Sequence, residues 1–158
     1  HRSDVRVAER DVLVDAELQW YALSGGRYDR IIANPPFGAW QSPERRKQLK
    51  GLFPNFYVKE SYTLFLILAL RLLRDGGKMV FIIPDTLLSL TMHTHVRATL
   101  LQEAKISEIV LFPSSFFPNI SFGYANLCLI TIEKCEDKKD CMANSVRIIQ
   151  GLRTVNDL

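Results

Sequence analysis

The residues best suited to chemistry form one short run, Asn34-Pro35-Pro36-Phe37. Two consecutive prolines have fixed φ angles and no N–H groups, so the turn is stiff and offers carbonyl oxygens without competing donors. Such a turn can aim the Asn34 side-chain oxygen and the Pro35 carbonyl at one point, which suits the two hydrogens of an amino group. On a nucleobase, accepting both hydrogens frees the nitrogen lone pair, and preorganised acceptors stabilise the charge that develops there. Phe37 then offers a flat face for the base. The alternative is a plain strand-ending turn.

The elements around this run predict an α/β domain with a largely parallel sheet. The run ends an apolar segment that reads as a strand, and a strong helix and a second strand follow. The second strand is apolar on both faces, which is typical of a strand covered by helices on both sides. Ligands bind beyond the carboxyl ends of such strands, where Asn34 stands. We expect strands at 28–33, 78–83, 106–111, 127–132 and 146–149, a weak strand around Val5 and Val7, and helices within 11–23, 43–49, 60–73 (ended by Gly76-Gly77) and 86–104.

Composition sets the class of protein. The chain has 158 residues, of which 47% are hydrophobic and 23% charged, values that are ordinary for one globular domain. Three cysteines exclude a disulfide scaffold and are typical of a reducing compartment, so we expect a cytoplasmic protein. No apolar run is long enough to span a bilayer, so no membrane partner is expected. We expect no metal site, because Cys135 and Cys141 lack a second ligand pair. His93 and His95 would point to different faces of a helix, at the surface.

A basic segment follows the run. Five basic residues and one acid lie between Gln41 and Lys59, a local charge of +4. A charged helix face in solvent is one interpretation. The other is contact with the phosphates of a nucleic acid backbone, and the residues predicted to make it are Arg45, Arg46, Lys47 and Lys50.

The sequence resembles a known enzyme family. The residues that carry the resemblance are "YDRIIANPPFG", "LFLILALRLLRDGGKMVFIIPDTLL" and "ISEIVLFPSSFFPNISFGYANLCLITIEK". They are similar to the adenine-N6 DNA methyltransferases of restriction–modification systems, above all the type I and type IIG enzymes, over about residues 4–134. The resemblance implies a Rossmann-like fold that depends on S-adenosylmethionine. It also implies methyl transfer to N6 of an adenine flipped out of double-stranded DNA.

The resemblance also implies which residues receive the target base. Asn34, Pro35 and Phe37 match the catalytic run of that family, with Pro36 supporting its geometry. Phe117 matches an aromatic residue that stacks on the flipped base from the other side. Phe116 competes for that role, and core packing is the alternative for Phe117.

Further roles concern the cofactor. Asp11 resembles the acid that binds the adenine amino group of S-adenosylmethionine, Val12 would pack on that adenine, and Asn34 would border the same pocket. Helix capping is the alternative role for Asp11. Glu60 departs from the family, where Asp or Asn is more usual, which puts a secondary base or cofactor contact in doubt. For Asp29 a role at the start of the strand is favoured over a catalytic one.

The resemblance covers only part of the family's fold. The family sheet runs 3-2-1-4-5-7-6, and the segment before Asp11 is too short for the glycine-rich cofactor loop. We therefore interpret residues 1–158 as one partial catalytic domain with strands 4-5-7-6, without strands 1 and 2 or a target-recognition domain. By itself this chain is expected to be inactive. The expected partners are the missing N-terminal part and a specificity domain or subunit.

With strand 1 missing, the 28–33 strand would be an unprotected edge. We expect it to self-associate, or to be covered by the first ten or so residues. Two other functions stay open. One is methylation of an amino group on rRNA, tRNA or a protein glutamine. The other is a fragment that binds nucleic acid without catalysis.

Overall fold

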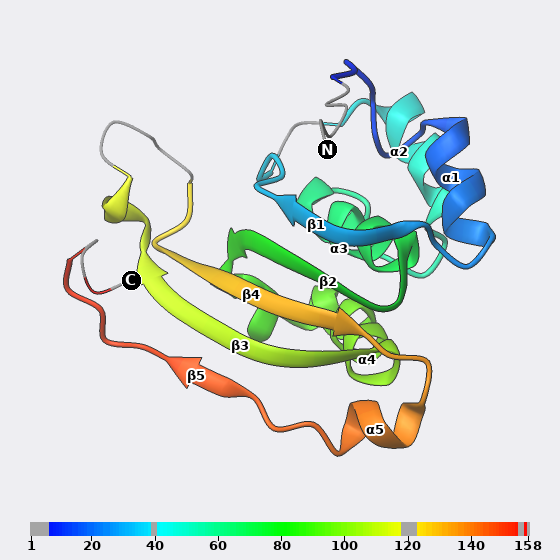
Figure 1. Cartoon of the computed structure of the whole chain (residues 1–158). Coiled ribbons are helices and arrows are strands. Elements are labelled where there is room, and N and C mark those ends of the chain that lie inside the picture. Colours follow the sequence, from blue (N-terminus) through cyan, green and yellow to red (C-terminus); the bar gives the residue numbers. More distant parts are fainter. Residues whose placement is uncertain (1–6, 39–40, 118–122, 155–156, 158) are drawn as a thin grey trace.

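The computed structural model describes residues 7–38, 41–117, 123–154 and 157 (Figure 1). Its strands are β1 Tyr28–Ala33, β2 Leu73–Pro84, β3 Ala104–Pro113, β4 Asn126–Lys134 and β5 Arg147–Ile149. Its α-helices are α1 Ala16–Leu23, α2 Pro43–Leu52, α3 Ser61–Leu72, α4 Thr94–Glu103 and α5 Lys138–Met142, and the short 3-10 helices are η1 Asp85–Leu88, η2 Thr91–His93 and η3 Ser114–Phe116. Within these ranges, every helix is too short or too polar to cross a membrane.

One five-stranded sheet organises the chain, in the order β1-β2-β4-β3-β5. β1 runs parallel to β2, β5 runs parallel to β3, and β4 is antiparallel to both of its neighbours. Four of the five strands therefore point the same way, and the predicted, mostly parallel α/β sheet is confirmed. The order also matches the expected 4-5-7-6 arrangement, with β1 at the edge of the described sheet.

The helices cover one face of this sheet. α3 packs on β2 and α4 on β3, behind the sheet in Figure 1. In β2 the alternate residues Met79, Phe81 and Ile83 are buried, whereas Val80 and Ile82 are only half-buried. The prediction that helices cover both faces is therefore wrong for the described residues. At one end the second face carries a small cluster of its own instead, formed by Val110, Phe112 and Leu127.

Two glycine pairs lie where β1 and β2 begin. Gly26 has φ +82°, and a Cβ built on it would lie 2.1 Å from the carbonyl oxygen of Leu73, so only glycine fits there. The second pair, Gly76-Gly77, does not end α3 as predicted. That helix ends at Leu72, because the chain turns directly into β2 at Leu73.

The exposed residues of β1 include an apolar one as well as the charged Asp29 and Arg30. Ile32 is 86% exposed, and Val7 is 94% exposed and belongs to no strand. Residues 7–10 therefore do not cover β1, and the weak strand predicted around Val7 is not formed. Val5 and the rest of residues 1–6 lie outside the described residues. The described sheet thus leaves an apolar edge at β1.

Candidate functional site

The Asn34–Phe37 turn lies at the carboxyl end of β1, as its position in an α/β sheet predicts. Asn34 is exposed, and its side chain makes no hydrogen bond to the described residues. Pro35 is buried beneath it. The Ser61 hydroxyl at the start of α3 donates to the Pro36 carbonyl oxygen over 2.9 Å. The turn is therefore fixed at its third residue while Asn34 faces outward.

Two tyrosines flank the aromatic residue of the turn. The half-buried Phe37 ring lies edge-on to Tyr62 of α3, with 6.2 Å between ring centroids, and edge-on to Tyr124, with 6.3 Å. Tyr124 precedes β4, far from Phe37 in the sequence. Sequence reasoning missed Tyr124, Tyr62 and Ser61, because only the fold brings them to the turn.

A buried polar cluster stands behind these aromatic residues. His93 Nε2 lies 3.0 Å from Glu60 Oε2 and 3.0 Å from the Tyr62 hydroxyl oxygen, which in turn lies 3.2 Å from the Thr86 hydroxyl. His93 is fully buried, so the prediction of a surface histidine is wrong. His93 is the last residue of η2 and precedes α4, so the direction of its side chain does not follow from a helical spacing to His95. The described residues contain no group of three or more His, Cys, Asp or Glu that could bind a metal.

Burial sets the protonation of this cluster. It raises the pKa of Tyr62 well above the usual range, and burial together with the negative charge of Glu60 raises the pKa of Tyr124. Burial also lowers the pKa of His93, outweighing the nearby Glu60 carboxylate, which acts the other way. At neutral pH the two phenols therefore keep their protons and His93 is uncharged.

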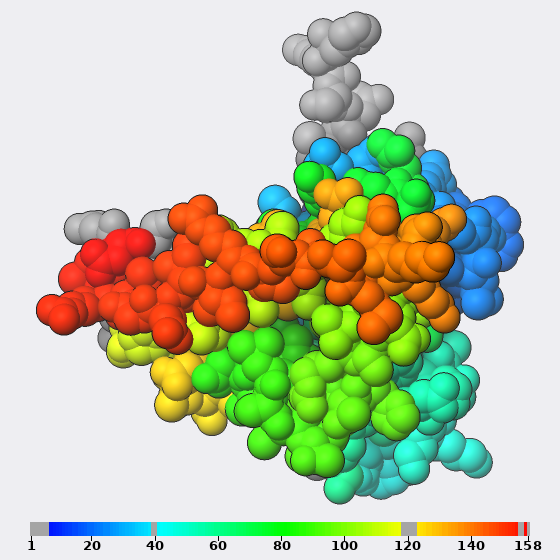
Figure 2. All heavy atoms as spheres, turned by 90° about the horizontal axis from the view of Figure 1, so that it is seen from below, coloured from blue at the N-terminus to red at the C-terminus, as the bar shows by residue number. Residues whose placement is uncertain are grey.

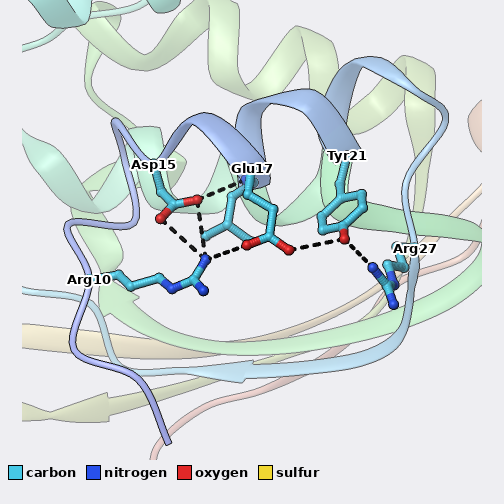
Figure 3. Close-up of polar contacts among 6 residues, drawn as sticks. Arg10, Asp15, Glu17, Tyr21 and Arg27 are labelled. Atoms are coloured by element: carbon cyan, nitrogen blue, oxygen red, sulfur yellow. Dashed lines mark hydrogen bonds and ion pairs between the residues drawn. The ribbon is translucent and has the colours of Figure 1, made fainter. Parts of the chain in front are cut away.

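The segment before α1 is held by a row of charged and polar side chains (Figure 3). Arg10 Nη1 lies 3.3 Å from Asp15 Oδ2 and 2.7 Å from Glu17 Oε2, and the row continues through Tyr21 to Arg27. Asp15 caps α1, accepting from the Leu18 N–H over 3.0 Å. The alternative that Asp11 caps this helix is therefore wrong.

Asp11 instead pairs with α2. Both carboxylate oxygens lie 2.6 Å from Nη2 of Arg45, and the Asp11 side chain is still 54% exposed. Val12 beside it is half-buried and packs on the main core. The structure thus brings Asp11 to the helix that follows the Asn34–Phe37 turn. Arg45, one of the residues predicted to contact phosphates, is thus paired with an acid in this structure.

The remaining basic residues of α2 line a groove of about 470 Å³. Arg46, Lys47 and Lys50 form one wall, and the 56–59 segment, including Tyr57 and Lys59, forms the other. The lining carries four cations and no carboxylate. The groove adjoins the buried polar cluster, since the Tyr57 ring lies 6.5 Å from that of His93 and Lys59 directly precedes Glu60.

A known protein family matches the part of the chain that contains this site. Residues 4–117 match the model of the Eco57I restriction-modification methylase. The chain belongs to this family. The match includes the Asn34–Phe37 turn, the basic groove, the Glu60–His93 cluster and Phe117.

The chain is similar to curated restriction–modification enzymes. It is 26% identical over 125 residues to a putative type II restriction enzyme and methyltransferase of Methanocaldococcus jannaschii, covering 78% of the segment and 10% of the relative. It is 24% identical over 139 residues to the type II methyltransferase M.AccI of Acinetobacter calcoaceticus, covering 84% and 25%. The chain thus spans a quarter or less of the length of these relatives.

Solved structures show the same fold. A chain from a type I restriction–modification system superposes with a TM-score of 0.66 at 24% identity, covering 82% of this chain and 25% of that one. The modification subunit of a putative type I restriction enzyme from Vibrio vulnificus gives 0.61 at 24% identity, covering 76% and 26%.

The predicted second stacking residue, Phe117, and its competitor Phe116 lie beside an aromatic residue of β3. Phe117 and Phe116 are both half-buried beside Phe112, at centroid distances of 6.1 and 6.0 Å. Phe117 and Phe37 pack on the same small cluster of the second sheet face, which places both near one end of the sheet. Asp29 forms an exposed ion pair with Arg74 on β2, in keeping with a role at the start of β1.

Proposed function

We propose that this methylase segment forms the target-base wall of an adenine-N6 DNA methyltransferase. The observation that carries the proposal is the turn itself. Asn34 is exposed and unpaired within the described residues, while Pro36 is anchored to Ser61. A fixed turn with an outward amide is what a preorganised acceptor site requires.

The turn acts on the amino group of a flipped base. The Asn34 side-chain oxygen and the Pro35 carbonyl accept the two amino hydrogens, which localises the nitrogen lone pair and prepares it for attack on a methyl group. Phe37 stacks on the base ring. Phe117 is the proposed stacking residue on the opposite side. A base inside the duplex cannot reach this turn, so it must first be extruded.

The segment supplies part of the S-adenosylmethionine site. Asp11 fits the adenine amino group of that cofactor, because a carboxylate has about four lone-pair positions and Asp11 is still 54% exposed although Arg45 lies close to both of its oxygens. Val12 would lie against the adenine ring and Asn34 would border the same pocket. When bound, the cofactor supplies the methyl group.

The basic groove is the proposed seat of the DNA backbone. Arg46, Lys47, Lys50 and Lys59 line this groove, and no carboxylate lines it with them. Phosphate contacts of this kind fix the position of the duplex without reading its sequence. Arg45 contributes indirectly, by tying α2 to Asp11. A specificity subunit or domain, as in type I systems, would then choose the site.

The test is methyl transfer by the whole protein that contains this segment. With tritiated S-adenosylmethionine, label is expected in DNA and, after digestion, in N6-methyladenine. Asn34→Ala should lower kcat by at least about 10²-fold, the usual effect of removing one preorganised transition-state contact. DNA binding should change by less than about twofold, because Asn34 is not a backbone contact.

The matched control is Asn55→Ala, since Asn55 is an exposed asparagine that follows a proline in another turn. It should leave kcat unchanged. Label in RNA or protein with unlabelled DNA would overturn the choice of substrate. Near-normal turnover by Asn34→Ala would overturn the mechanism.

A further inference from the structure

Buried polar side chains gather at one place in this structure. Among the described residues, the buried polar or charged side chains are Ser61, Thr63 and His93. The first two lie in the first turn of α3, and the third packs against it. Burying a polar group costs free energy unless it is well paired. A cluster of this kind, beside the base site, therefore needs an explanation other than filling space.

His93 contacts two residues that flank Ser61. Its Nε2 lies 3.0 Å from both Glu60 Oε2 and the Tyr62 hydroxyl. A nitrogen lone pair facing the Glu60 carboxylate would be repelled, so Nε2 carries the hydrogen and the Tyr62 oxygen accepts it. The Tyr62 and Thr86 hydroxyls share a further hydrogen bond. The imidazole thus hydrogen-bonds residue 62 and lies against the carboxylate of residue 60 through the same atom.

The backbone that carries the imidazole is held by further hydrogen bonds. The backbone N–H of His93 donates to the Leu90 carbonyl over 3.1 Å. The Arg97 side chain of α4 donates to the carbonyls of Leu87 and Leu90 over 2.8 Å each. The η1–η2 segment is therefore fastened to α4 directly behind the site. The backbone position of His93 is therefore set by its contacts with this segment and α4.

Simple packing does not account for the cluster. Both His93 Nδ1 and Glu60 Oε2 are buried and make no hydrogen bond of good geometry to the described residues. Buried polar groups left without a partner destabilise the folded protein. A leucine would fill the same space without that cost.

We propose that His93 is a positioning residue for the target-base site, fixing the start of α3 and thereby the Asn34–Phe37 turn. The connection runs from His93 through Glu60 and Tyr62 to Ser61, whose hydroxyl holds the Pro36 carbonyl. Tyr62 adds a second connection through its edge contact with Phe37. This inference rests on the proposed function for its kinetic consequence.

The experiment uses the whole protein with His93→Leu and His93→Gln. Leucine removes the Nε2 donor, whereas the glutamine amide nitrogen reaches nearly the same position as Nε2. His93→Leu is expected to lower kcat at least about tenfold, because small misplacements at a reacting centre cost up to about 10². The KM for DNA should change less than about twofold, and His93→Gln should recover most of kcat. His95→Leu, an exposed histidine two residues away, is the control and should have no effect.

A second measurement separates this inference from the proposed function. Hydrogen exchange of the peptide covering Asn34–Gly38 should accelerate in His93→Leu and return toward the wild-type rate in His93→Gln, whether or not the protein methylates anything. Ser61→Ala keeps the cluster and removes only its connection to Pro36, so it serves if His93→Leu does not fold. It should accelerate the same exchange.

Its loss of kcat should not add to that of His93→Leu, because both changes break one connection. Unchanged exchange in both Ser61→Ala and the His93 variants would overturn the inference, as would equal loss of kcat in His93→Leu and His93→Gln. Absence of methyl transfer by the wild type, with exchange altered as expected, would overturn only the proposed function.

Discussion

Neutralising the basic groove should change how DNA binding responds to salt. The perturbation is the triple substitution of Arg46, Lys47 and Lys50 by glutamine, which keeps the length of the side chains and removes three charges from one wall. All three residues lie on α2, and none of them forms an ion pair within the described residues, unlike Arg45. The fold should therefore be retained.

The magnitude follows from the number of contacts. Each phosphate neutralised by a cation contributes about 0.9 to the slope of log Kobs against log salt concentration. Three contacts give a slope smaller by about 2.7 in the variant. Between about 50 and about 200 mM salt, the wild type should then lose roughly 40-fold more affinity than the variant. The difference should be independent of DNA sequence.

Fluorescence anisotropy of a labelled duplex, titrated at several salt concentrations, measures this slope in the whole protein. The control replaces Lys138, Lys139 and Arg153 by glutamine, which removes the same charge from exposed positions. These belong to α5 and the C-terminal segment, away from α2 on the surface (Figure 2). A slope that falls equally in both triple variants would refute the groove as a phosphate site. An unchanged slope in the groove variant would refute it as well.

Three further outcomes are expected. Gly26→Ala should destabilise the protein by about 2 kcal/mol more than Gly25→Ala in chemical unfolding, because both positions have positive φ but only Gly26 meets a carbonyl; equal costs would contradict the steric argument. Burial lowers the pKa of His93, so the unfolded state binds more protons than the folded state. The free energy of unfolding should therefore fall as pH drops below about 6.5. His93→Leu should flatten that dependence in unfolding experiments between about pH 5 and about pH 8. In sedimentation of this chain, Ile32→Lys should reduce self-association while Leu101→Lys, exposed on α4, should not; a monomeric wild type would count against association through β1.

The local elements were largely predictable because their signals are local. β1 has the predicted bounds, and α3 differs from its predicted range by one residue at each end, since apolar periodicity and the flanking prolines and glycines define both. The order of the strands followed from the resemblance to the family. The reversed direction of β4 could not be read from its own residues, because direction depends on the partner strands.

The site could be predicted only where its residues are consecutive in the sequence. The Asn34–Phe37 turn is continuous in sequence, so its chemistry was visible there. Ser61 and Tyr124 reach that turn from other elements, and no periodicity signals their contact. His93 was misassigned because a helical spacing rule was applied to a residue that ends a 3-10 turn before the helix. The pairing of Asp11 with Arg45 was likewise invisible, because 34 residues separate them.

The central place of β4 has a consequence for how the chain folds. β1, α3 and β2 form a parallel unit from the first 84 residues, but β3 is joined to β2 only through β4, which comes later in the chain. During synthesis at roughly 5–20 residues per second, residues 114–134 take roughly 1–4 s to appear, and for that time an apolar strand has no partner. A polypeptide that stops before Asn126 would therefore not be a smaller version of this sheet. It would contain the β1–β2 pair and the single strand β3, each with an unpaired edge where β4 belongs. Unpaired strand edges of this kind promote aggregation.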